Sequence, residues 1–261
     1  MSDVATTRYR LAENTIIAIS RLVFLAVFFG IWEYVSQNHI INPIFIGTPS
    51  EIVKFLWNGL FVEFTLERDL LWTIVSTFLA FAIGSAAGIL TSLVFITWPA
   101  VEKFSDPLLS ALNALPRIAL APLFLLWFGL GIWSKVALGA SLTYFIVLSS
   151  AVAGIRGTNS DHLTLARTMG ASQRQTFVRI TLPNAVPTIF SGLRLGLIYA
   201  LLGVIAGEII AAQYGLGQQL SFLAGSFQIS GVFAVLAILA LLGTSLLWAM
   251  NKIESRLLRW Q

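Results

Sequence analysis

The chain has 261 residues, of which 57% are hydrophobic and only 11% are charged, and its mean hydropathy is +0.85. This composition excludes a water-soluble domain, a disordered chain and a coiled coil, and the absence of cysteine excludes disulfides and thiolate metal sites. The net charge of +4 does not indicate nucleic-acid binding, because basic side chains at a membrane surface account for it. The sequence therefore predicts an all-α membrane protein.

Six apolar stretches are long enough to cross a bilayer, whose core of about 30 Å needs roughly 20 helical residues. In chain order they are residues 16–35, 70–98, 107–128, 136–155, 186–210 and 231–250. Together they predict one transmembrane domain over residues 1–261. The first stretch also fits a signal peptide preceded by Arg8 and Arg10. A retained helix is favoured, because no small-residue cleavage site follows and residues 32–34 are typical of an interfacial anchor.

Basic residues are distributed unevenly between the two sides of this six-span scheme. With the N-terminus inside, eleven Lys and Arg residues fall on the inner side and two lie within spans, whereas the outer side has Lys54, Arg68 and Lys135. Cytoplasmic connections of membrane proteins carry such an excess. We therefore expect both termini and the connection at residues 156–184 to be cytoplasmic.

The first outer connection, residues 37–69, is too short for a catalytic domain. Its Pro43, Gly47 and Pro49 predict turns that lead into a short amphipathic helix near residues 52–61, at the outer surface.

The inner connection at residues 156–184 predicts two short helices separated by Gly170. Ser172 and Gln175 have the spacing of a capping box at the start of the second helix. Pro183 and Pro187 are expected to prevent that helix from continuing into the fifth span. On physical grounds alone, an ordinary structured loop is an equally good interpretation.

No catalytic machinery is evident in the sequence. ATP hydrolysis needs a phosphate-binding loop with a lysine after a glycine, and none of the four lysines follows a glycine. His39 and His162 form no metal-ligand pattern, so no metal site is predicted. The chain is therefore predicted not to be an enzyme, and energy for uphill transport has to come from an ion gradient or another subunit.

Residues 164–183 contain a recognisable pattern. Ala166, Gly170 and the run 180–183 match the sequence Glu-Ala-Ala, three residues, Gly, nine residues, Ile-x-Leu-Pro, although Thr164 and Leu165 replace its glutamate and first alanine. The segment resembles the EAA loop of permease subunits of bacterial ATP-binding-cassette (ABC) importers. Residues 48–50, 116–131, 192–194 and 207–217 are similar to motifs of the subfamily for taurine, sulfonates, nitrate and pyrimidine precursors.

The resemblance implies a type I ABC importer permease fold in the bacterial inner membrane, with several partners. These are a second copy of the permease, two ATPase subunits that bind ATP and Mg, an external solute-binding protein and the lipid bilayer; this chain would bind no cofactor. The first loop helix would dock on the ATPase through Thr164, Leu165, Ala166, Arg167, Thr168, Met169, Gly170 and Ala171. Ser172, Gln175 and Pro183 would set the geometry of the loop.

Polar residues inside the spans are candidates for the translocation path, because an ionisable group that faces lipid is costly. The candidates are Asn113, Arg117, Tyr144, Arg194 and Glu208. One alternative is that Arg194 extends to the inner membrane surface and Glu208 lies at the outer one. Another is that Arg117 neutralises carbonyls freed at a proline kink or break. Four glycines share one face of the fifth span and predict close contact with another helix. They are Gly192, Gly196, Gly203 and Gly207.

The sequence therefore favours the permease subunit of an ATP-driven importer that passes a small solute. An ion-gradient-driven secondary transporter is the first alternative, although few carboxylates are available within the spans. A membrane scaffold or assembly protein without transport activity is the second alternative.

Overall fold

The computed structural model describes residues 2–257, with side chains from residue 16 onward, and every element in that part of the chain is helical. Arg8, Arg10 and Arg259, which the sequence places on the inner side, lie outside the described side chains. The long helices are α1 (Ser2–Gln37), α4 (Thr65–Thr97), α5 (Pro99–Ala114), α7 (Ile132–Arg156), α10 (Leu182–Ile210) and α12 (Ile229–Leu257). The shorter elements are α2 (Pro43–Ile46), α3 (Pro49–Trp57), η1 (Asn58–Val62), η2 (Arg117–Leu120), α6 (Ala121–Phe128), α8 (Ser160–Thr168), α9 (Gln173–Thr176), η3 (Phe177–Thr181) and α11 (Leu216–Gly225).

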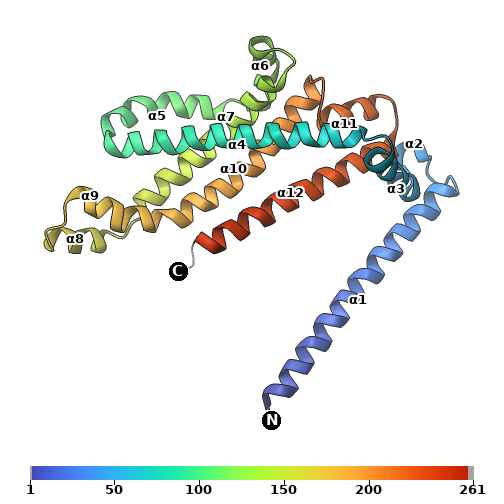
Figure 1. The fold of residues 1–261 in the computed structure, drawn as a ribbon, viewed down its shortest axis with the longest axis horizontal. Coiled ribbons are helices and arrows are strands. Elements are labelled where there is room, and N and C mark those ends of the chain that lie inside the picture. The colour runs from blue at the N-terminus through green and yellow to red at the C-terminus, as the bar shows by residue number, and fades with distance from the viewer. Residues whose placement is uncertain (1, 258–261) are drawn as a thin grey trace.

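The centre of the bundle is α7, which packs between α4 and α10 (Figure 1). The predicted glycine face of α10 meets α7 directly: a Cβ atom at Gly203 would lie 2.6 Å from the Cα atom of Gly139. On the other side of α7, a Cβ at Gly84 of α4 would lie 2.6 Å from the backbone oxygen of Ala140. Small residues let helix backbones approach closely where lipid provides no hydrophobic driving force. The predicted role of the α10 glycines in helix contact is confirmed.

In the part of the chain that the structure describes, five helices are long and apolar enough to span a membrane. The third predicted span, residues 107–128, is not a single helix. It divides into the end of α5 and the η2–α6 segment, which meet at an angle of 87°. Pro116 lies in extended backbone between the two parts. A proline lacks the amide that would continue the helix and restricts the residue before it. Of the kink or break that Pro116 and Pro122 predict, the structure has the break.

The segment after α8 differs from the prediction. The helix that begins at Gln173 continues through η3 into α10, up to Ile210. Pro183 and Pro187 lie inside this continuous helix. The reason is the wider π-helical turn at residues 177–181, because it gives the ring of Pro183 space beside the carbonyl four residues earlier.

The two ends of the bundle carry different short elements (Figure 1). At one end lie α8 and α9, and at the opposite end lie α3 and α11. The predicted amphipathic helix near residues 52–61 corresponds to α3 and η1. By contrast, α11 was not predicted. It packs on α10 and α12, where its Leu216 and Leu223 form a buried cluster with Leu66.

The long helix α1 extends away from the other helices below its junction with α2 and α3 (Figure 1). None of its membrane-spanning window is buried in the chain. Hydrogen bonds fix the junction: the carboxylate of Glu33 accepts from the amide of Ser50 at 3.0 Å and from its hydroxyl at 2.7 Å, and the amide of Thr48 donates to Ser230 Oγ of α12. The motif at residues 48–50 therefore attaches α1 to α3 and α12.

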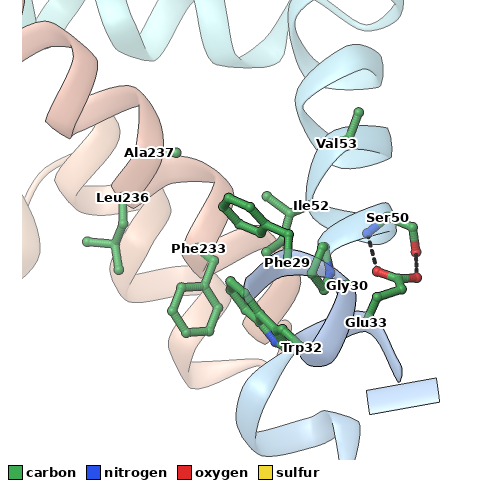
Figure 2. A pocket seen from close by; sticks show the side chains of 11 residues that line it. Phe29, Gly30, Trp32, Glu33, Ser50, Ile52, Val53, Phe233, Leu236 and Ala237 are labelled. Atoms are coloured by element: carbon green, nitrogen blue, oxygen red, sulfur yellow. Dashed lines mark hydrogen bonds between the residues drawn. The ribbon is translucent and has the colours of Figure 1, made fainter. Parts of the chain in front are cut away.

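An apolar groove of about 880 Å³ is lined by residues of α1, α3 and α12. Figure 2 shows Phe29 and Trp32 of α1 and Phe233 of α12 at this groove, with Glu33 turned towards Ser50. The rings of Trp32 and Phe233 are 5.3 Å apart in an edge-on arrangement.

Candidate functional site

The predicted break at Gly170 is confirmed. Gly170 has a φ of +79°, in the left-handed region, and the amide of Ala171 donates to the backbone oxygen of Ala166 at 2.9 Å. This is the geometry that glycine gives to the end of a helix. Two residues later, Ser172 accepts from the amide of Gln175, and Gln175 Oε1 accepts from the amide of Ser172, so the predicted capping box is present.

The helix before this break, α8, has an exposed apolar surface. Leu165 is 60% exposed and Met169 is 78% exposed, and four residues of separation place them on the same side of a helix. Ala166 faces inward and is buried, whereas the other predicted docking residues are exposed or half-buried. Those residues are Thr164, Arg167, Thr168, Gly170 and Ala171. We call the exposed side of α8, with Leu165 and Met169, the α8 surface.

Two of the predicted path residues lie together at the break of the third span. The guanidinium of Arg117 donates to the backbone oxygen and to Oδ1 of Asn113. Its Cζ atom also lies 4.1 Å from the ring centroid of Phe145 on α7, in a cation–π contact. Asn113 is exposed and Arg117 is half-buried in this chain. Next to Phe145, Tyr144 is half-buried, and its hydroxyl lies 3.3 Å from Thr91 Oγ1 of α4.

Arg194 and Glu208 lie near opposite ends of α10 and contact different helices. Arg194 forms an ion pair with Glu254 of α12. Glu208 is 1% exposed, and its Oε1 lies 2.7 Å from Nζ of Lys135, which is 3% exposed. Lys135 is not in an outer connection, as the sequence suggested, but in the first turn of α7.

The five predicted path residues therefore occupy three places in the bundle. Asn113, Arg117 and Tyr144 lie around Phe145, while Arg194 and Glu208 are each paired elsewhere. The sequence did not predict the partners Phe145, Glu254 and Lys135, nor Thr73 of α4, whose hydroxyl donates to the carboxylate of Glu208. Spacing along one helix identifies neighbours on that helix, whereas these partners come from other helices. Among residues 16–257, whose side chains the structure describes, no group of three or more His, Asp or Glu is placed to hold a metal ion.

Comparison with known proteins identifies the family. Residues 84–259 match the family described as "Binding-protein-dependent transport system inner membrane component". The chain is 36% identical to the formylaminopyrimidine transport permease protein ThiX of Halalkalibacterium halodurans, over 94% of this chain and 96% of that protein. It is 30% identical to the taurine transport system permease protein TauC of Escherichia coli, over 97% of this chain and 92% of that protein.

Solved structures show the same fold at lower sequence identity. An amino acid ABC transporter chain has a TM-score of 0.62 at 18% identity and matches 79% of this chain and 96% of its own length. A chain of the inward-facing MetNI methionine ABC transporter has a TM-score of 0.57 at 19% identity, over 77% and 94% of the two chains. The family match covers more than half of the chain, and the relatives align over nearly their whole length. The chain therefore belongs to the family of binding-protein-dependent transport system inner membrane components, as a multi-pass permease subunit of an ABC importer.

Proposed function

We propose that this permease transmits ATP-driven motion through the α8 surface. The observation that carries the proposal is the exposed pair Leu165 and Met169 at the end of α8, where Gly170 ends the helix and a capping box starts α9. Neighbouring apolar side chains that form one exposed patch outside the membrane are typical of a protein interface. The partner is an ATPase subunit, which binds ATP and Mg, and the helix from Gln173 to Ile210 carries the motion into the bundle.

In this proposal the α8 end is cytoplasmic and the α11 end is external. The distribution of basic residues supports this orientation, because Arg156, Arg167, Arg174 and Arg179 are all at or beside α8 and α9. Both termini are then cytoplasmic, and the external solute-binding protein contacts the α11 end.

A second copy of the chain is the proposed partner within the membrane. The support is α1, whose apolar side chains remain exposed within one chain, for example Phe24 at 68% and Leu22 at 66%. A helix that packs so little against its own bundle is available to pack against a second copy. The face at Asn113 and Arg117 is also open in one chain, so two copies together would enclose a path there.

The proposed solute is small and polar, of the kind represented by taurine, sulfonates, nitrate or a pyrimidine precursor. Relatives named for taurine, aliphatic sulfonates and formylaminopyrimidine support this class. Arg117 supports an anionic or electron-rich solute, because a cation beside a narrow path raises the local concentration of anions.

Carboxylates introduced into the α8 surface should weaken its binding to the ATPase. We expect the variant Leu165→Asp with Met169→Asp to bind the ATPase about thirtyfold more weakly, because two buried anchors of an interface become carboxylates. Co-purification of the ATPase with tagged permease measures this loss. Ser221→Asp, which adds a charge to an exposed residue at the α11 end, is the matched control and should leave the yield of ATPase unchanged. Equal yields from all three proteins would contradict the docking role of α8.

Removing the charge at the break of the third span should slow uptake. We expect Arg117→Met to lower the uptake of an anionic solute by about tenfold at low concentration, and Arg117→Lys to keep most of it, because the charge attracts the solute. Phe145→Leu removes the cation–π contact and keeps the charge, so it is the control for packing. Uptake at the wild-type rate by Arg117→Met would show that Arg117 has only a local role at the kink.

Reconstituted vesicles test the function as a whole. Uptake through the permease, its ATPase and its binding protein should require ATP and should stop when the phosphate-binding lysine of the ATPase is replaced. A secondary transporter would instead lose uptake with an uncoupler and keep it with the inactive ATPase. A scaffold would give no uptake in any combination.

A further inference from the structure

The carboxylate of Glu208 is surrounded by donors from three other segments at the α11 end of the bundle. Lys135 Nζ of α7 donates to Oε1 at 2.7 Å. Thr73 Oγ1 of α4 lies 2.9 Å from Oε2, and the amide of Gly217, at the start of α11, donates to Oε2 at 2.9 Å. Because all of these groups are buried, they hydrogen-bond to one another in place of water, and loss of one removes a hydrogen-bond partner from the groups that it contacts. We call Thr73, Lys135 and Glu208 the Glu208 cluster.

The same side chains hold the loop between α10 and α11. Lys135 Nζ donates to the backbone oxygen of Tyr214 at 2.9 Å, and the amide of Leu216 donates to Thr73 Oγ1 at 2.9 Å. A neighbouring side chain adds a further bond, since the amide of Gly215 donates to Oδ1 of Asp69 at 2.9 Å. Three successive amides, from Gly215 of the loop into the first turn of α11, are therefore bound to side chains of α4 and α10.

The glycines around this loop provide the space for the carboxylate. A Cβ atom at Gly215 would lie 2.1 Å from Oε1 of Glu208, and one at Gly217 would lie 2.6 Å from its Cβ atom. A Cβ at Gly207 would lie 3.0 Å from the Cβ atom of Lys135. The motif at residues 207–217 is thus one unit, in which the glycines let backbone and ion pair approach closely.

A cavity of about 460 Å³, with a mixed polar and apolar lining, lies beside the loop between α10 and α11. Its lining includes Arg68 of α4, Tyr214 of the loop and Gln218 of α11. The guanidinium of Arg68 lies 4.0 Å above the ring of Tyr214, so the loop contributes directly to the shape of this surface. A change in the loop would therefore change the surface of the permease that faces outward.

We propose that Glu208 and Lys135 are a positioning pair, which fixes the loop at residues 211–217 and α11 to α4, α7 and α10 so that the outer surface moves with the bundle. Glu208 then acts through the loop and does not contact the solute. This inference rests on the proposed function, because it takes the α11 end as the side that meets the binding protein.

Because Glu208 and Lys135 form a buried ion pair, a double-mutant cycle can test their role in positioning the loop. Removing one partner leaves an unpaired buried charge, whereas removing both charges is far less harmful. Glu208→Gln and Lys135→Met are the single variants, and the double variant combines them. Gln at position 208 keeps an oxygen that can accept from the amide of Gly217. Thr73→Val removes the acceptor for the amide of Leu216, and Thr73→Ser restores its hydroxyl.

Hydrogen exchange of residues 211–220 in the purified complex reports on the loop directly, because the amides of residues 215–217 are held by side chains. Each single charge variant and Thr73→Val should speed their exchange by about tenfold or more. The double variant should exchange more slowly than either single charge variant, and Thr73→Ser should exchange more slowly than Thr73→Val. In the variants whose amides at residues 215–217 lose protection, the binding protein should stimulate ATP hydrolysis less. The rate of ATP hydrolysis without the binding protein should stay unchanged.

Arg194→Gln and Glu254→Gln are the matched controls, since they break the other ion pair of α10 near its opposite end. They should leave exchange at residues 215–217 unchanged. The proposal is overturned if Glu208→Gln abolishes uptake while the loop stays protected, because the carboxylate would then act on the path. It is also overturned if the control variants expose the loop equally. Failure of the proposed function is seen separately, as a wild-type complex that shows no ATP-dependent uptake.

Discussion

Replacement of Gly170 by valine should abolish uptake while the ATPase subunits continue to hydrolyse ATP. Gly170 has a φ of +79°, and a left-handed conformation costs other residues about 1–2 kcal/mol, more for a β-branched side chain. Apart from Gly170 and its two chain neighbours, no atom of the described residues lies within 4 Å of a Cβ built at this position, so the cost comes from the backbone and not from a clash. The chain would relieve it by changing the angle between α8 and the helix that begins at Gln173. The α8 surface would then no longer transmit motion to the bundle.

The matched control for this prediction is Gly170→Asn. Asparagine adopts the left-handed conformation more readily than other non-glycine residues, and the open space accommodates its side chain. We expect this variant to keep most of the uptake. Uptake and ATP hydrolysis should be measured together in the same vesicles. Normal uptake by Gly170→Val, with normal stimulation of ATP hydrolysis, would show that the angle at this break does not matter.

Replacement of Gly203 by alanine should destabilise the bundle, although alanine is the better helix former by about 1 kcal/mol. The added Cβ atom would lie 2.6 Å from the Cα atom of Gly139, where two helix backbones are in contact and no flexible side chain can move aside. Overpacking of this kind costs about 1–3 kcal/mol, which corresponds to a fall in Tm of roughly 2–10 °C for a chain of this size. Thermal unfolding of the detergent-purified complex measures the difference.

Gly243→Ala is the control, because the position is also helical but its surroundings are open. The nearest atom to a Cβ there is Leu201 Cδ2 at 3.7 Å, an ordinary contact. We expect an unchanged or slightly higher Tm for this variant. If Gly203→Ala were as stable as Gly243→Ala, the contact between α7 and α10 would have to be looser than the structure shows.

Local patterns in the sequence predicted much of the structure near α8 and α10. The capping box at Ser172 and Gln175 depends on two side chains three residues apart, so their spacing was sufficient to predict it. The glycine face of α10 follows in the same way from helical periodicity. In both cases the interaction, or the face that makes it, is defined within one segment of the chain.

Features that depend on several segments were not predictable from these patterns. Lys135 directly precedes an apolar stretch, so the sequence predicts it in an outer connection. In the structure its Nζ atom donates to Glu208 and to the backbone oxygen of Tyr214 inside the bundle. Pro183 predicts the end of a helix, but the π-helical turn before it lets the helix continue. Likewise, α11 is short, and its place depends on the loop that Glu208 holds. Each outcome is decided by tertiary contacts, which periodicity along one chain does not contain.

If α8 docks on an ATPase and two copies of the chain form the importer, the intact complex contains both subunits in fixed numbers. Native mass analysis of the complex that co-purifies with the tagged chain, gently extracted from its membrane, measures this composition. We expect two copies of this chain with two ATPase subunits, and loss of the ATPase alone in the variant with Leu165→Asp and Met169→Asp. Recovery of the chain without an ATPase, even after crosslinking from residues 164–170, would show that α8 does not dock on one.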